Sequence, residues 1–138
     1  MSTRREAREV ALKALYAVES SEVEIEPVVT ELASEAGLSP RLSAFCLCLC
    51  QQVGSHRAML DGLISRHLEH WSLERVARID RILLRMALAE FLFFEDIPPR
   101  VSIDEAIELA RRFSTAQSPG FVNGILDAIM IGEKKVDR

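Results

Sequence analysis

The apolar positions of this chain recur at helical spacing from end to end, and no segment shows the strict alternation of a half-buried strand. The first periodic stretch predicts a helix from about Thr3 to Glu19. Its inward face would consist of Ala7, Val10, Ala11, Ala14, Leu15 and Val18. A second helix is expected from about Ile25 to Ala36, and Gly37 follows it as a plausible left-handed cap.

The middle of the chain predicts one long helix and one buried helix. Ser39-Pro40 opens a stretch that would run to about His67, with Gly54 and Gly62 as weak points. The chain turns around Trp71, and a further helical stretch begins near Ser72. From Ile79 to Phe94 the sequence is apolar nearly all round, which indicates a central helix without a solvent face. Asp96-Ile97-Pro98-Pro99 would end it.

Two more helices are expected in the tail. Ser102 and Glu105 have the spacing of a capping box, and Val101 and Ala106 that of a hydrophobic staple. Ile103, Ala106, Ile107, Ala110 and Phe113 then form one apolar stripe. Ser118-Pro119 would open the last helix as N-cap and first residue. Its core face would be Val122, Ile125, Leu126 and Ile129, with Phe121 about 90° to the side at about 100° per residue.

These elements predict an all-α fold of six or seven helices in one compact unit, residues 1–138, with a flexible tail from about 132. A chain of 138 residues suits a single domain. Neither a membrane-spanning stretch nor a secretory signal is recognised, and three cysteines without such a signal favour a reducing cytoplasm.

Metal and enzyme chemistry are poorly supported. On a helix, Cys46 and Cys50 would share a face while Cys48 points away, so buried small hydrophobes are favoured over a zinc site. His56, His67 and His70 do not have the spacing of a ligand set. No nucleophile elbow or glycine-rich phosphate loop is present. We therefore expect a protein without a metal, a cofactor or a catalytic site.

The charge is unevenly distributed. The net charge is −4, yet residues 1–8 carry three arginines against one acid, and Glu22 to Glu35 form an acidic stretch without a base. A polyanion would therefore need a local basic patch. Arg4, Arg5 and Arg8 at the start of the first helix suit phosphate contacts and oppose the helix dipole. The alternative is a solvated, frayed helix start.

Several single residues allow two interpretations. Phe121 could stack on an RNA base near a helix N-terminus, or it could be a rim residue of the core that packs on Ile125. Tyr16 points outward as amphipathic cover or as an interface anchor. The glycine at position 124 lies opposite the core stripe, which a close backbone or ligand approach would explain. Arg85 and Glu90 in the central helix indicate structural pairing of buried charges.

Three segments together resemble the NusB family of transcription antitermination factors. They are RREAREVALKALY near the start, RIDRILLRMALAEF in the centre and VSIDEAIELARRFSTAQSPGFVNGILD in the tail. The resemblance spans nearly the whole chain, and the tail motif is its specific part. It implies a non-catalytic helical fold of two small bundles. It also implies a heterodimer with the ribosomal protein NusE that binds single-stranded boxA RNA in ribosomal operon leaders and promotes processive transcription with RNA polymerase.

The resemblance also assigns residues. RNA-binding positions would be Arg4, Arg5, Arg8, Phe121 and Asn123, and NusE-binding positions would be Tyr16, Glu74 and Asp80. Asp80 has a competing role as a capping or salt-bridging group at the start of the central helix. Glu6 and Gly120 stand where the family is often basic, so the affinity of the free chain for RNA should be modest.

Two rival functions remain open at this point. One is an RNA-recruiting module related to the N-terminal domains of some RNA cytosine methyltransferases. The other is a pure protein–protein adaptor bundle with incidental arginines. The RNA hypothesis requires the basic start of the first helix and Phe121 to flank the same strand. Exposed aromatics also favour self-association of the free protein through the surface later used for a partner.

Overall fold

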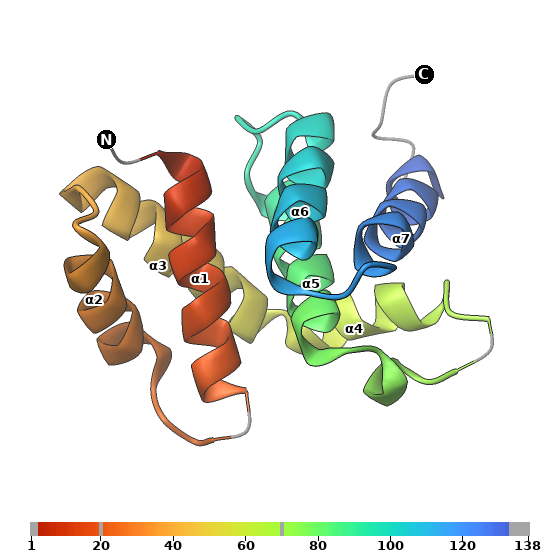
Figure 1. Cartoon of the computed structure of the whole chain (residues 1–138), viewed down its shortest axis with the longest axis horizontal. Coiled ribbons are helices and arrows are strands. Elements are labelled where there is room, and N and C mark those ends of the chain that lie inside the picture. The colour runs from red at the N-terminus through yellow and green to blue at the C-terminus, as the bar shows by residue number, and fades with distance from the viewer. Residues whose placement is uncertain (1–2, 20, 70, 133–138) are drawn as a thin grey trace. The chain divides into compact units, whose positions relative to one another are not determined.

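The computed structural model describes residues 3–19, 21–69 and 71–132, and within these ranges the chain is helical without any strand (Figure 1). The helices fall into two compact units, divided between Ser55 and His56. The first unit holds α1 (Arg4–Val18), α2 (Ile25–Ala36) and α3 (Pro40–Ser55). The second holds α4 (Arg57–Ser65), the short 3-10 helix η1 (Leu73–Arg75), α5 (Arg78–Phe93), α6 (Pro99–Phe113) and α7 (Ser118–Gly132). The all-α expectation is thus confirmed, and the tail expected after residue 132 lies outside the described residues.

The first unit packs α1 against both α2 and α3. α1 begins in a capping box: the Thr3 hydroxyl accepts from the Glu6 amide at 3.2 Å, and the Glu6 carboxylate accepts from the Thr3 amide at 2.6 Å. This use of Glu6 was not anticipated from the sequence. α2 ends as predicted at Gly37, which adopts the left-handed conformation with φ 71°.

The single long helix predicted from Pro40 to about His67 is wrong, because the chain leaves the helical conformation at His56, with φ −117° and ψ 22°. The break follows Gly54, where a glycine lowers the free energy needed to interrupt a helix. The His56 ring stacks on the Phe93 ring, with 4.2 Å between centroids. This contact ties the start of α4 to the end of α5.

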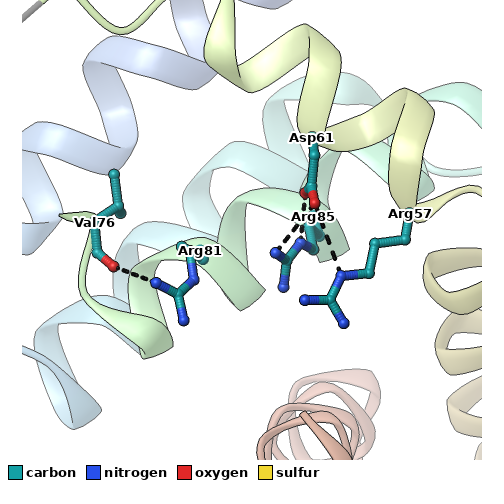
Figure 2. A network of polar contacts seen from close by, with 5 residues as sticks. All are labelled: Arg57, Asp61, Val76, Arg81 and Arg85. Atoms are coloured by element: carbon teal, nitrogen blue, oxygen red, sulfur yellow. Dashed lines mark hydrogen bonds and ion pairs between the residues drawn. The ribbon is translucent and has the colours of Figure 1, made fainter. Parts of the chain in front are cut away.

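The central helix α5 is buried along its whole middle, from Ile82 to Glu90, as its composition predicts. Two charged side chains in this buried stretch, Arg85 and Glu90, each have a polar partner. The Arg85 guanidinium lies 2.7 Å from the Asp61 carboxylate of α4, which also meets Arg57 at 3.7 Å (Figure 2). Glu90 accepts a 2.7 Å hydrogen bond from Ser102 of α6. The structural interpretation of Arg85 and Glu90 is therefore confirmed.

The capping box predicted at Ser102 and Glu105 is wrong. α6 begins earlier, at Pro99, with Pro98 as the residue before it. Proline is suited to the first helical position because it has no amide hydrogen to leave unpaired. Ser102 is therefore inside the helix and 2% exposed, where its hydroxyl satisfies the buried Glu90 carboxylate.

The last helix starts at Ser118, one residue before the predicted position, and Val122, Leu126 and Ile129 are buried as expected. The Ser118 side chain does not act as a simple N-cap, because its hydroxyl bonds to Asp80 of α5. α7 packs on α6 and α5 and completes the second unit (Figure 1). None of the described helices is long and apolar enough to cross a bilayer.

Candidate nucleic-acid interface

The first turns of α1 present a basic surface made by two arginines. Arg4 and Arg5 are exposed, whereas Arg8, one turn further on, is only 4% exposed. The guanidinium carbons of Arg4 and Arg8 lie 4.7 and 5.6 Å from the centroid of the Phe45 ring of α3. Such cation–π contacts are worth about 0.5–2 kcal/mol each. Arg8 thus packs within the unit, and Arg4 and Arg5 are the arginines that an outside phosphate would reach.

Phe121 lies in the first turn of α7 and is half-buried, as its position beside the core stripe predicts. Its ring helps line a cavity of about 420 Å³ within the second unit. The other walls come from η1 and its flanks, from the start of α5 and from the α6–α7 turn. Residues lining it include Trp71, Arg75, Val76, Asp80 and Gln117.

The two residues after Val122 on α7 are accessible. Asn123 and Gly124 are exposed, and so is Gly120 before them. A Cβ atom built at either glycine would meet nothing within 4 Å. Within the described residues, no close backbone approach therefore explains the glycine at 124.

The three expected partner-binding residues differ in access. Tyr16 is 46% exposed on α1, and Glu74 is exposed on η1. Asp80 is only 6% exposed. Its two carboxylate oxygens accept hydrogen bonds of 2.7 Å from Ser114 and 2.8 Å from Ser118. Asp80 thus joins α5 to the α6–α7 turn. This is a structural role, the kind of alternative to partner binding that the sequence leaves open.

The 3-10 segment is fixed to the second unit through its backbone. Arg81 of α5 donates to the Val76 carbonyl at 2.9 Å (Figure 2). It also donates to the Glu74 carbonyl at 3.1 Å. A charged donor shared by two carbonyls of one turn restricts that turn. Glu74 and Arg75 are therefore presented from a fixed backbone.

The predicted residues divide between the two units. Arg4, Arg5, Arg8 and Tyr16 belong to the first, and Phe121, Asn123, Glu74 and Asp80 to the second. Within the second unit, the structure brings Phe121 and Asp80 to the same cavity. The meeting of the arginines with Phe121 stays a prediction.

Sequence reasoning missed Trp71 and Arg75 as neighbours of Phe121. Trp71 is the only tryptophan of the chain and is 53% exposed. The signal that the sequence offered is a single tryptophan at an expected turn, since this residue is highly buried on average. The proximity of Trp71 to α7, which begins 47 positions later, depends on the tertiary structure and could not be read from the sequence.

The cysteines lie as their helical spacing predicts. Cys46 and Cys50 are buried and Cys48 is exposed. The hydrogen bond with Cys46, together with burial, raises the pKa of Cys50, and the Cys50 thiol lies 3.8 Å from the Ala11 carbonyl oxygen. In the part of the chain that is described, no three histidine, cysteine or acidic side chains gather as a metal site. His70, one of the histidines considered from the sequence, lies outside that part.

The family match and the similar proteins agree on one family. Residues 5–130 match the NusB family. The transcription antitermination protein NusB of Salinibacter ruber is 42% identical over 132 residues, which cover 95% of this chain and 82% of that protein. The protein of the same name from Nitratiruptor is 40% identical over 129 residues, 94% of this chain and 92% of the relative.

Solved structures agree with this result. The structure of T. maritima NusB superimposes with a TM-score of 0.87 at 40% identity, covering 93% of this chain and 90% of that one. A chain of a complex of the antitermination factors NusB and NusE with dsRNA gives a TM-score of 0.85. At 24% identity, over 94% of this chain and 96% of that one, this second similarity concerns the fold alone.

Proposed function

This chain belongs to the NusB family, and we propose that it acts as a non-catalytic transcription antitermination factor that binds RNA together with the ribosomal protein NusE. Relatives at about 40% identity carry the antitermination name. A protein of the same fold has been solved in a complex of NusB and NusE with dsRNA. We further propose that the RNA is a single-stranded boxA-type segment of ribosomal operon leaders, bound in the cytoplasm in a complex with RNA polymerase.

One observation carries the RNA part of the proposal: the exposed cations and the accessible aromatic ring are all in first helical turns. Arg4 and Arg5 are exposed in the first turn of α1, and Phe121 is half-buried in the first turn of α7. Guanidinium groups bind phosphate oxygens, and aromatic rings stack on unpaired bases. Asn123 is exposed further along α7 and offers an amide to a base edge.

The NusE part is supported by exposed anchors of the right chemistry. Tyr16 presents a large amphipathic side chain, and Glu74 presents a carboxylate to a basic partner. The buried Asp80 would contribute by fixing the α6–α7 turn. Where two partial surfaces share one RNA, RNA and NusE must each tighten the binding of the other by the same factor.

The test is binding of a fluorescently labelled leader RNA across ionic strength, with and without NusE. We expect weak binding by the chain alone and tighter binding by the pair. The logarithm of the binding constant should fall linearly with the logarithm of salt concentration, because phosphate contacts release counterions. Replacing Arg4 and Arg5 together by alanine should reduce the slope by up to about 1.4 to 1.8, from about 0.7–0.9 per contact.

A matched control removes two exposed cations from other places. Lys13→Ala with Arg111→Ala changes the net charge equally and should leave the slope unchanged. Equal RNA affinity with and without NusE would refute the cooperative mechanism. If RNA binding does not depend on salt, or if the double arginine variant leaves the slope unchanged, a protein–protein adaptor is favoured instead.

A further inference from the structure

We propose that the cavity beside Phe121 is a binding site for one unpaired RNA base, which stacks on Trp71 as well as on Phe121. This inference rests on the proposed function, because it assigns a second aromatic wall to the RNA site. The cavity has a volume of about 420 Å³, within the usual range of sites for small ligands.

Trp71 is not needed for the core of the second unit. Its side chain is 53% exposed although tryptophan has a large apolar surface. It lines the cavity together with the half-buried Phe121. Two aromatic residues on one open cavity are typical of proteins that hold unstacked bases, where each ring offers a face to the base.

The charges around the cavity favour a polyanion over an apolar protein side chain. Arg75 is exposed and lines the cavity, and the first turn of α7 carries the positive end of a 15-residue helix. The acid that lines it, Asp80, has both oxygens engaged by serine hydroxyls. A base in the cavity would therefore have its phosphate next to Arg75 and the start of α7, while the Asp80 carboxylate accepts from the two serine hydroxyls.

The remaining walls suit the polar edge of a base. Thr115 and Gln117, exposed in the α6–α7 turn, offer a hydroxyl and an amide. The opposite wall is held in place, since Arg81 fixes the carbonyls of Glu74 and Val76 on either side of Arg75. A preformed site lowers the entropy cost of binding. A base paired in a duplex could not present its faces to the rings, so the occupant is single-stranded.

The experiment uses the single tryptophan as a reporter. The full chain is labelled with 5-fluorotryptophan, which gives one fluorine resonance whatever tryptophans NusE contains. We expect this resonance to shift when single-stranded boxA-type RNA is added to the complex with NusE. NusE contacts the neighbouring Glu74 in the proposed function, so the resonance of the complex with NusE is the starting point, and RNA should shift it further. A resonance that RNA leaves unchanged in this complex would overturn the proposal.

A second measurement locates the base. The RNA is made as a series with one abasic position each, and binding to the complex is measured by anisotropy. One abasic position should weaken binding about 5- to 150-fold, the range for loss of a stacked base. Trp71→Ala should weaken binding of intact RNA by a similar factor and should abolish most of the penalty at that one position. Trp71→Phe should keep most of the affinity.

The outcomes separate this inference from the proposed function. If the complex binds RNA but Trp71→Ala binds as tightly as the unchanged chain, the base site is refuted and antitermination stands. If the unchanged complex does not bind RNA at all, the proposed function fails first. Thermal unfolding of each variant checks folding. If Trp71→Ala is unstable, the Trp71 fluorine resonance of the unchanged chain decides the matter, because intact RNA should shift it and RNA that is abasic at the one position should not.

Discussion

The hydroxyl of Ser118, the first residue of α7, donates a 2.8 Å hydrogen bond to Oδ2 of Asp80 in the first turn of α5. Asp80 is 6% exposed, and its other oxygen accepts from Ser114 at 2.7 Å. The same Ser118 oxygen accepts from the Thr115 amide at 3.2 Å. The Asp80 carboxylate and the Ser118 hydroxyl therefore fix the α6–α7 turn, which precedes Phe121 in α7.

The first prediction concerns this network. Asp80→Ala should lower the free energy of unfolding by about 2 kcal/mol, because hydrogen bonds to a buried charged group are lost and two hydroxyls lose their acceptor. Asp80→Asn keeps one acceptor oxygen and should cost about half as much. Chemical denaturation measures both. The exposed Glu74→Ala serves as the control and should leave stability unchanged. If Asp80→Asn weakened NusE binding without loss of stability, Asp80 would be a contact residue after all.

The second prediction concerns the pair between Asp61 of α4 and Arg85 of α5 (Figure 2). The Arg85 side chain is 4% exposed and that of Asp61 27%. Asp61→Ala would leave a buried guanidinium without this partner and should cost about 2–3 kcal/mol, below the range for a fully buried pair. Arg57→Ala removes the weaker contact of the same carboxylate and should cost less than about 0.5 kcal/mol. Equal losses in urea denaturation would contradict this ranking.

The third prediction uses the glycine at position 124. Because an added Cβ meets nothing within 4 Å, Gly124→Ala should raise the free energy of unfolding by about 1 kcal/mol through its better helix propensity. A loss of stability would contradict the structure at this position. RNA affinity, measured on the same variant with NusE, then distinguishes the two meanings of this glycine. Weaker binding indicates that RNA approaches the backbone there, and unchanged binding indicates open solvent.

The fourth prediction concerns thiol reactivity. Cys48 is exposed, whereas Cys46 and Cys50 are buried and hydrogen-bonded to each other, which raises the pKa of the Cys50 thiol. Brief treatment of the native protein with iodoacetamide near neutral pH should therefore give one adduct per chain, on Cys48. Denatured protein should give three adducts. Mass spectrometry counts them, and Cys48→Ser should remove the native adduct. Rapid labelling of Cys50 in the native state would contradict its burial.

Local signals in the sequence identified most helices correctly. Gly37 marks the end of α2 because a left-handed residue terminates a helix wherever it occurs. The all-round apolar run from Ile79 to Phe94 identified the buried α5, since such a helix has no stable position at the surface. These features depend on residues within one or two turns of each other.

One error occurred where a distant residue competes for a polar side chain. Ser102 has the spacing of a capping residue, yet its hydroxyl serves Glu90, 12 positions earlier. There the energy of satisfying a buried carboxylate exceeds that of the local motif. Arg8 is buried against Phe45, and its role as an RNA contact stays a prediction.

The order of residues alone thus determined the helical class, most helix boundaries, the charged start of α1 and the half-accessible position of Phe121, because helical periodicity and chain-local hydrogen bonds decide these. Tertiary packing decided which polar groups are buried together and which aromatic residues line one cavity. Asp80 meets Ser118, and Trp71 lines the same cavity as Phe121, only because three segments of the second unit fold against one another. No local pattern encodes such contacts, since they depend on burying apolar surface and pairing polar groups that are far apart in the chain.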